Sequence, residues 1–328
     1  MTNPLTADGA PQSAILFLHA QTALHPGSGT ALGVVDLPIQ RERHTQWPLI
    51  PGTSLKGVLR DCCRPLRTDN DKWQQWLAVF GPDTGNAADH AGALSISDAR
   101  ILAFPVRSLR GAFAWVTCHE TLKRFHRDLH LVGEEDSNVD HLCNPADTEC
   151  ACKKEFGDKR TSPVLLDGNK LVLEEYDFTW KTELSDAVIR RVQQAADEFT
   201  QEQLAERLVV LSNDYFTHFV QHATEVVARI ALDAETKTVK GQALFYEEFV
   251  PAETLFYSLA FPEESRRKFK AEDETEGRKT TALSRAQVID FVKTGLRQRH
   301  DVIQIGGGET TGKGLCKVRL YTGKEECA

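Results

Sequence analysis

The stretch LHPGSGTALGVVDLPIQRERHTQWPLIPGTSLKGVLR fills residues 24–60. It places a glycine-rich turn before one acid, Asp36, that stands among apolar residues, and a basic loop with Arg41 and Arg43 follows. Glycines let a backbone approach a bulky ligand closely, and guanidinium groups bind phosphates. One acid among these basic groups would weaken simple anion binding. Asp36 therefore indicates a chemical role.

A Pro-Gly turn then opens a helix. We expect this helix to be capped by Thr53 or Ser54 and to end near residue 66. Lys56 and Arg60 lie one turn apart on it and make a positive stripe. Because a helix N-terminus beside glycines suits anions, the stripe predicts contact with phosphates. The alternative is an ordinary solvated helix face.

Composition restricts the class of protein. The chain has 328 residues and a formal net charge of -8, which argues against a protein that coats nucleic acid without specificity. A local basic groove on an acidic body stays compatible with this charge. No run of about 18 apolar residues occurs, so we expect no membrane span. The first residues lack the pattern of a secretory signal, and the 8 cysteines indicate reduced cytoplasmic thiols or metal ligands.

The order of strand-like and helix-like segments predicts an α+β fold. Residues 13–22 form a short apolar run that is typical of a buried strand. Strands and helices then mix without regular βαβ units, which favours a ferredoxin-like sheet with large insertions over a doubly wound sheet. We expect one domain, 1–328, with insertions at about 64–92 and 134–222. Two strand-like runs within 241–261 predict a hairpin.

A group of soft ligands lies in the polar segment 134–170, which we expect to be a long insertion or a loop. His141, Cys143, Cys150 and Cys152 are residue types that hold zinc, and one zinc ion would pin such a loop. The C-x6-C-x-C spacing is not that of a standard zinc knuckle. The alternative is a set of reduced thiols.

The loop IGGGETTGKG fills residues 305–314. Gly307 begins a match to the phosphate-loop pattern G-x-x-x-x-G-K that ends at Lys313, but a glycine follows where magnesium binding needs Ser or Thr. The loop also precedes a strand rather than a helix, so we exclude ATP or GTP hydrolysis. The backbone of Gly306, Gly307 and Gly308, with Lys313, suits the phosphates of a polymer. The alternative is a flexible hairpin turn.

Asp36 gains a functional interpretation from its expected partners. His25 stands beside glycines earlier in the same stretch, so the two side chains can meet across one loop. A His and an Asp near a phosphodiester support general acid–base cleavage or metal-assisted attack. RNA carries its own nucleophile, the 2′-hydroxyl. The alternative for Asp36 is a turn or cap residue.

The expected hairpin carries further candidates. Tyr246 and its aromatic neighbours can stack on bases, although aromatics that alternate along a strand more often pack in a core. Glu247 and Glu248 lie at the expected hairpin tip, where carboxylates are ordinarily solvated.

Together these motifs resemble the RAMP superfamily of CRISPR systems, and the backbone subunits of the type III-B, or Cmr, effector complex are the most similar members. The resemblance rests on LHPGSG with GVVDLPIQRERHT and PLIPGTSLKGVLR, on ALFYEEFVPAETLFY and on GGGETTGKG. The motifs lie at residues 15–60, 241–261 and 303–320. The middle of the chain adds little.

The resemblance implies a palm like an RNA-recognition motif, a finger-like insertion and a projecting thumb hairpin. Copies of such a subunit stack along a CRISPR guide RNA beside other Cmr-type subunits. They cut the bound target RNA beside each thumb with a divalent metal, Mg²⁺ or Mn²⁺. By motif, Asp36 would be the cleavage residue, and its assistants would be His25, Tyr246, Glu247 and Glu248.

The same resemblance would place Lys56, Arg60 and the loop 306–313 on the guide backbone. Two alternatives stay open. One is a non-cleaving structural RNA-binding backbone subunit, which would not need Asp36. The other is a stand-alone guide-processing ribonuclease, which the stacking thumb argues against.

Overall fold

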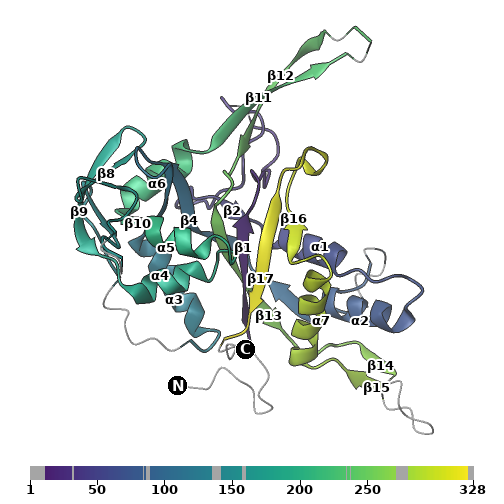
Figure 1. The fold of residues 1–328 in the computed structure, drawn as a ribbon. Coiled ribbons are helices and arrows are strands. Elements are labelled where there is room, and N and C mark those ends of the chain that lie inside the picture. Colours follow the sequence, from purple (N-terminus) through teal and green to yellow (C-terminus); the bar gives the residue numbers. More distant parts are fainter. Residues whose placement is uncertain are drawn as a thin grey trace.

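The computed structural model describes residues 12–31, 33–83, 85, 89–134, 142–156, 160–233, 235–236, 238–270 and 280–323. Within these residues one mixed sheet of 13 strands has the order β16-β17-β1-β13-β4-β5-β10-β6-β9-β8-β7, with β2 added to β4 and β3 added to β13. Two separate two-stranded sheets, β11-β12 and β14-β15, extend from this body (Figure 1). The fold therefore mixes helices and strands, as the sequence predicts.

Four neighbouring strands form an antiparallel unit within the sheet. In sheet order they are β17 (Leu315–Tyr321), β1 (Ala14–Ala20), β13 (Leu255–Pro262) and β4 (Ala99–Arg107). Helix α1 (Gly52–Cys62) lies between β1 and β4 in the chain, and α7 (Arg285–Arg297) lies between β13 and β17. The resulting βαββαβ order is the connection order of a ferredoxin-like sheet.

Strand β1 of this unit is buried on both faces. Leu16 and Leu18 belong to one hydrophobic core, whereas Ile15 and Phe17 belong to a second core on the opposite face. Because both faces are buried, the strand sequence AILFLHA is continuously apolar instead of alternating.

Helices cover both faces of these strands. Side chains of α1 and α7 fill the first core. Side chains of three other helices fill the second: α3 (His119–His130), α4 (Asp186–Gln193) and α5 (Gln201–Arg207). Local sequence starts two of the five helices, because the hydroxyls of Ser185 and Ser284 accept backbone N–H groups in the first turns of α4 and α7. The sheet therefore lies between two helical layers.

The described part of 134–170 contains short strands, so of the two expected forms, an insertion or a loop, the loop is wrong there. Four strands continue the sheet beyond β10 (Leu208–Leu211): β6 (Glu149–Cys152), β7 (Leu165–Leu166), β8 (Lys170–Leu173) and β9 (Tyr176–Glu183). Three of these strands have four residues or fewer, and Phe178 is the one fully buried residue of β9. Strands this short and this polar give little periodic signal.

The predicted hairpin at 241–261 is wrong in its pairing. Both runs are strands, but β12 (Val239–Phe249) pairs with β11 (Glu225–Leu232), while β13 joins β1 and β4 in the main sheet. The chain at Pro251 therefore leads from one sheet into another. The β11–β12 hairpin extends away from the body, at the top of Figure 1.

The remaining elements complete the layers. They are β2 (Leu49–Ile50), α2 (Asn70–Phe80), β3 (Leu94–Ile96), β5 (Phe113–Cys118), α6 (Asn213–His222), β14 (Lys268–Lys270), β15 (Thr280–Ala282), β16 (Val302–Gln304) and the 3-10 helix η3 (Glu309–Thr311). In the described ranges, no helix has the length and apolar character needed to cross a membrane.

Candidate active site

The glycine-rich segment singled out in the sequence lies against the base of the β11–β12 hairpin. Leu24 and Val250 form an antiparallel bridge, and Leu37 and Glu247 form a parallel one. The backbone N–H of Glu248 donates to the carbonyl of Leu37 at 3.0 Å. These contacts bring the early glycine-rich turn beside a strand that comes much later in the chain.

Asp36 lies beside Tyr246 in this arrangement. Its Oδ2 accepts the backbone N–H of Tyr246 at 2.8 Å, and the N–H of Leu37 donates to the carbonyl of Tyr246 at 3.0 Å. Asp36 is half-buried and Tyr246 is 40% exposed, so both side chains reach the surface. Within the described residues the second carboxylate oxygen of Asp36 has no hydrogen-bond donor, which leaves it open to a substrate.

His25 is buried between the hairpin and the late glycine loop. Its Nδ1 lies 2.7 Å from the carbonyl oxygen of Glu248, and because a carbonyl only accepts, Nδ1 carries a proton. Its Nε2 lies 3.9 Å from Oε1 of Glu247. The imidazole packs on Phe249 with ring centres 5.5 Å apart. The ring is therefore fixed, and Nε2 is the nitrogen left for chemistry.

The late glycine loop packs directly on His25. Gly306 has a φ of 79°, and a Cβ there would lie 2.2 Å from the carbonyl oxygen of His25. A Cβ at Gly27 would lie 2.7 Å from Nε2 of His25. The N–H of Gly307 donates to the carbonyl of His25 at 3.0 Å. Close packing on His25 thus explains these glycines, and the N–H of Gly307 is already used within the fold.

Lys313 extends from the same loop over the site. Its N–H donates to the carbonyl of Gly308 at 3.1 Å, and its ammonium nitrogen lies 5.1 Å from the centre of the Phe249 ring. In the part of the chain that the structure describes, Lys313 has no acidic partner, so its charge is available to a phosphate. We call the residues gathered here the Asp36 cluster: His25, Asp36, Tyr246, Glu247 and Lys313.

Glu248 is a structural carboxylate, and the expectation of a solvated tip is wrong for it. It is 6% exposed. Its Oε1 binds the guanidinium of Arg41 at 2.6 Å and accepts the hydroxyl of Thr224 at 2.8 Å, while Oε2 accepts the N–H of Ile39 at 3.1 Å. Arg41 also donates to the carbonyl of Val220 at 2.9 Å. Arg41 and Glu248 therefore hold the basic loop on the body.

Glu247 is also buried, and its partner is Arg229 of β11. The Nε of Arg229 forms an ion pair with Oε2 of Glu247, and the guanidinium lies 5.4 Å from the centre of the Phe249 ring. Arg229 lies outside the sequence motifs that predict the site. Arg229 can be recognised as a partner of Glu247 only from the register of β11 and β12, in which Val227 lies opposite Glu247. The sequence does not predict this strand pairing.

The predicted RNA-binding residues of α1 have different surroundings. Arg60 pairs with Asp83 at 2.9 Å and lies 4.2 Å from the centre of the Trp76 ring, so it is used in packing α1 on α2. Lys56 is half-buried, and burial, together with the nearby charge of Arg60, lowers its pKa. Arg43 is exposed in the basic loop. Lys56 and Arg43 therefore keep their side chains available, whereas Arg60 does not.

The expected zinc site is not assembled in the described residues. Cys150 and Cys152 of β6 face the first core, whereas Cys143 packs against the second core on the other side of the sheet. Burial raises the pKa of Cys150 to about 12 and that of Cys152 well above its usual range, which disfavours the thiolates that zinc needs. These three cysteines therefore do not meet at one site in the described residues, and a structural zinc ion stays a prediction. His141 lies outside the described residues.

The described residues of the site offer no complete ligand set for a divalent metal. Among the residues described, no group of three or more His, Cys, Asp or Glu side chains could hold a metal ion. Glu247 and Glu248 are each paired with an arginine. Asp36 is thus the single carboxylate of the site that is open to a metal, and one carboxylate does not fit a protein-bound ion.

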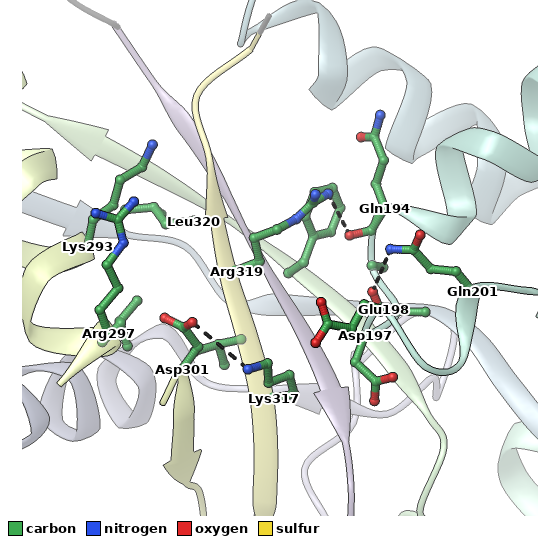
Figure 2. A pocket seen from close by; sticks show the side chains of 15 residues that line it. Gln194, Asp197, Glu198, Gln201, Lys293, Arg297, Asp301, Lys317, Arg319 and Leu320 are labelled. Atoms are coloured by element: carbon green, nitrogen blue, oxygen red, sulfur yellow. Dashed lines mark hydrogen bonds and ion pairs between the residues drawn. The ribbon is translucent and has the colours of Figure 1, made fainter. Parts of the chain in front are cut away.

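A cavity of about 530 Å³ lies elsewhere, between α7, the loop after α4 and the face of β17 (Figure 2). Its charged groups are largely used within the fold. Lys317 pairs with Asp301 at 3.9 Å, and Arg319 donates to the carbonyl of Gln194 at 2.7 Å. The cavity shares no lining residue with the Asp36 cluster. We therefore assign the candidate active site to the cluster at the hairpin base.

Comparison with known proteins agrees with the resemblance seen in the motifs. The family model of the RAMP superfamily matches residues 17–317, which is most of the chain. The chain is 38% identical over 308 residues to the CRISPR system Cmr endoribonuclease Cmr4 of Pyrococcus furiosus, covering 92% of this chain and 94% of that relative. The chain therefore belongs to the RAMP superfamily and, within it, to the Cmr4 family.

Solved structures agree with the fold. The crystal structure of oligomeric Cmr4 from Pyrococcus furiosus matches with a TM-score of 0.66 and 29% identity, over 95% of this chain and 99% of that one. The cryo-EM structure of the type III-B Cmr-beta complex bound to cognate target RNA contains a chain that matches with a TM-score of 0.69 and 22% identity, over 95% and 98% of the two chains.

Proposed function

We propose that this chain is a backbone subunit of a type III-B CRISPR effector complex that binds guide RNA and cuts complementary target RNA. Membership of the Cmr4 family and 38% identity to a Cmr endoribonuclease support this proposal. The observation that carries it is the place of Asp36, held at the surface beside Tyr246. The imidazole of His25 and the ammonium of Lys313 belong to the same cluster. An acid, an imidazole and a cation gathered at the base of one hairpin suit a phosphodiester.

The proposed parts of the molecule follow from its elements. The four-stranded unit with α1 and α7 is the palm, and the β11–β12 hairpin is the thumb. The insertions at about 64–92 and 134–222 supply the finger within one domain. Copies of the subunit would stack along the guide beside other Cmr-type subunits. The oligomeric Cmr4 crystal structure and the target-bound Cmr-beta complex support these partners.

The chemistry of cleavage can be argued from the atoms of the Asp36 cluster. The 2′-hydroxyl of the target attacks the adjacent phosphorus, the bond to the 5′-oxygen breaks, and a cyclic phosphate is left. The open carboxylate oxygen of Asp36 orients the 2′-hydroxyl and accepts its proton. His25, held through Nδ1, donates a proton from Nε2 to the departing oxygen when it is protonated. Lys313 balances the charge that develops on the phosphate.

The divalent metal implied by the resemblance is not part of these steps. The described residues of the site do not fit one by themselves, since two of the three carboxylates of the site, Glu247 and Glu248, are neutralised by arginines. A requirement for Mg²⁺ or Mn²⁺ stays a prediction for the RNA-bound complex.

Replacing Asp36 tests the proposal. Asp36→Asn keeps an oxygen that accepts the Tyr246 N–H, so assembly should hold. Cleavage of labelled complementary RNA should fall by about a hundredfold or more, because a positioned acid–base group is lost. Guide and target affinity should stay near that of the wild type. The assay is run on the assembled complex with magnesium, with manganese and with a chelator. Asp177→Asn, which changes an exposed acid of β9, is the matched control.

One observation favours a second candidate function. Asp36 already bonds the Tyr246 backbone, which is a structural role that a non-cleaving RNA-binding backbone subunit would also need. A wild-type complex that binds target RNA without cutting it would support this second function. Wild-type rates in Asp36→Asn would remove Asp36 from the mechanism. Cleavage of guide precursors by the isolated chain would instead support the stand-alone ribonuclease.

A further inference from the structure

Glu247 lies between Arg229 and His25 at the base of the hairpin. Its Oε2 forms an ion pair with Nε of Arg229, while its Oε1 lies 3.9 Å from Nε2 of His25. The residue is only 8% exposed, so its carboxylate has lost most of its water. A buried carboxylate needs a cationic partner, and Arg229 is the closer of the two.

The hairpin itself holds Arg229 in place. Val227 lies opposite Glu247 and Arg229 lies opposite Phe245, so Arg229 is a diagonal neighbour of Glu247 on one face of the strand pair. The guanidinium also lies 5.4 Å from the centre of the Phe249 ring, which fixes the end of the side chain. The ion pair is therefore set by the register of β11 and β12.

Among the described residues this arrangement leaves Nε2 of His25 without a hydrogen-bond partner. A hydrogen bond between an imidazole nitrogen and a carboxylate brings the two atoms to about 2.8 Å, and the observed 3.9 Å is too long for one. Nδ1 is already used on the carbonyl of Glu248. If Glu247 lost Arg229, its burial would drive it toward His25. Lys313, the other cation over Phe249, is not paired with Glu247 in the described residues.

We propose that Arg229 is a positioning residue for RNA cleavage, because it holds the carboxylate of Glu247 away from Nε2 of His25. His25 then keeps the nitrogen that faces the scissile phosphodiester. This inference rests on the proposed function, and it assigns a role to a residue outside the motifs that carry the family resemblance.

A double-mutant cycle on Arg229 and Glu247 tests the inference in the assembled complex. Arg229→Met keeps the stem over Phe249 and removes the charge. Its single-turnover cleavage rate should fall about tenfold or more, while the Kd for target RNA holds. Arg229→Lys keeps a charge and should restore most of the rate. In the Glu247→Gln background, Arg229→Met should cost little further, because the carboxylate that would capture His25 is gone.

The controls separate this inference from the proposed function. Arg107→Met changes an exposed arginine of β4 that pairs with Glu174, and it should leave the rate unchanged. Arg229→Gln closes the same cycle if Arg229→Met does not assemble. An equal loss of rate with and without Glu247→Gln would overturn the inference, and so would a loss of RNA affinity alone.

Wild-type and Asp36→Asn complexes are measured in parallel. A wild-type complex that does not cut target RNA counts against the proposed function. A wild-type complex that cuts, together with an unaffected Arg229→Met complex, counts against the role of Arg229 only.

Discussion

His25 occupies a space that glycines leave open. A Cβ at Gly27 would lie 2.7 Å from Nε2 of His25, so in Gly27→Ala the ring or the strand must move. We expect the cleavage rate to fall about tenfold or more in single-turnover assays, because a small displacement of a reacting group lowers the rate strongly. RNA affinity should stay near that of the wild type.

The control for this substitution is Gly57→Ala in α1. A Cβ at Gly57 would meet nothing within 4 Å. Alanine there should raise the free energy of unfolding by roughly 0.5–1 kcal/mol and leave the rate unchanged. Equal rates for Gly27→Ala and the wild type would show that His25 tolerates the shift.

The residues of the site differ in how far the sequence could predict them. Asp36 and His25 stand out because they share one short glycine-rich stretch. The sequence identifies Glu247 and Glu248 as candidate site residues but does not predict their burial. Their burial depends on ion pairs with Arg229 and Arg41, which come from other parts of the chain. The sequence does not identify Arg229 as a site residue, because its contact with Glu247 depends on the pairing of β11 with β12, and the predicted hairpin has a different pairing.

At the scale of elements, α1 packs on α2 through a stacked side chain. Arg60 lies over Trp76, and the indole N–H of Trp76 donates to the carbonyl of Arg60 at 2.7 Å. Arg60→Ala should therefore lower the free energy of unfolding by about 1–3 kcal/mol, because it removes the stacking and the ion pair with Asp83. Lys56→Ala should leave stability nearly unchanged. Thermal unfolding measures both.

The opposite result would restore the original hypothesis for α1. An unchanged melting temperature in Arg60→Ala, together with weaker guide binding, would mean that Arg60 acts on RNA as the sequence pattern predicts. The expected result, a loss of stability in Arg60→Ala but not in Lys56→Ala, would show that these two residues of the helical stripe have different roles.

The start of α7 is encoded locally in the sequence, whereas the start of α1 and the partner of β12 depend on the fold. Ser284 and Gln287 form a capping box at α7, and this pattern lies within four residues. Helix α1 was expected to be capped by its own Thr53 or Ser54, but the N–H of Gly52 donates to the carboxylate of Asp98 at 2.7 Å. That cap comes from a residue near β4, so only the fold reveals it. The partner of β12 was missed for the same reason.

At the scale of the whole molecule, the acidic body limits how RNA is held. The formal net charge is -8, and Arg41 and Arg60 are used within the fold. Guide affinity should therefore depend on a small number of side chains, among them Lys56 and Lys313, instead of on a diffuse positive surface.

Salt titration measures this dependence directly. Each phosphate contact with a single strand contributes a slope of about -0.7 to the logarithm of affinity against the logarithm of salt concentration. Lys56→Ala and Lys313→Ala should each reduce the slope by about that amount. Lys181→Ala is the matched control, because this exposed lysine pairs with Glu149 at 3.4 Å and belongs to β9, which lies far from β1 in the order of the main sheet. A slope that neither substitution changes would mean that other residues hold the guide, and Arg43, exposed in the basic loop, would be the next to test.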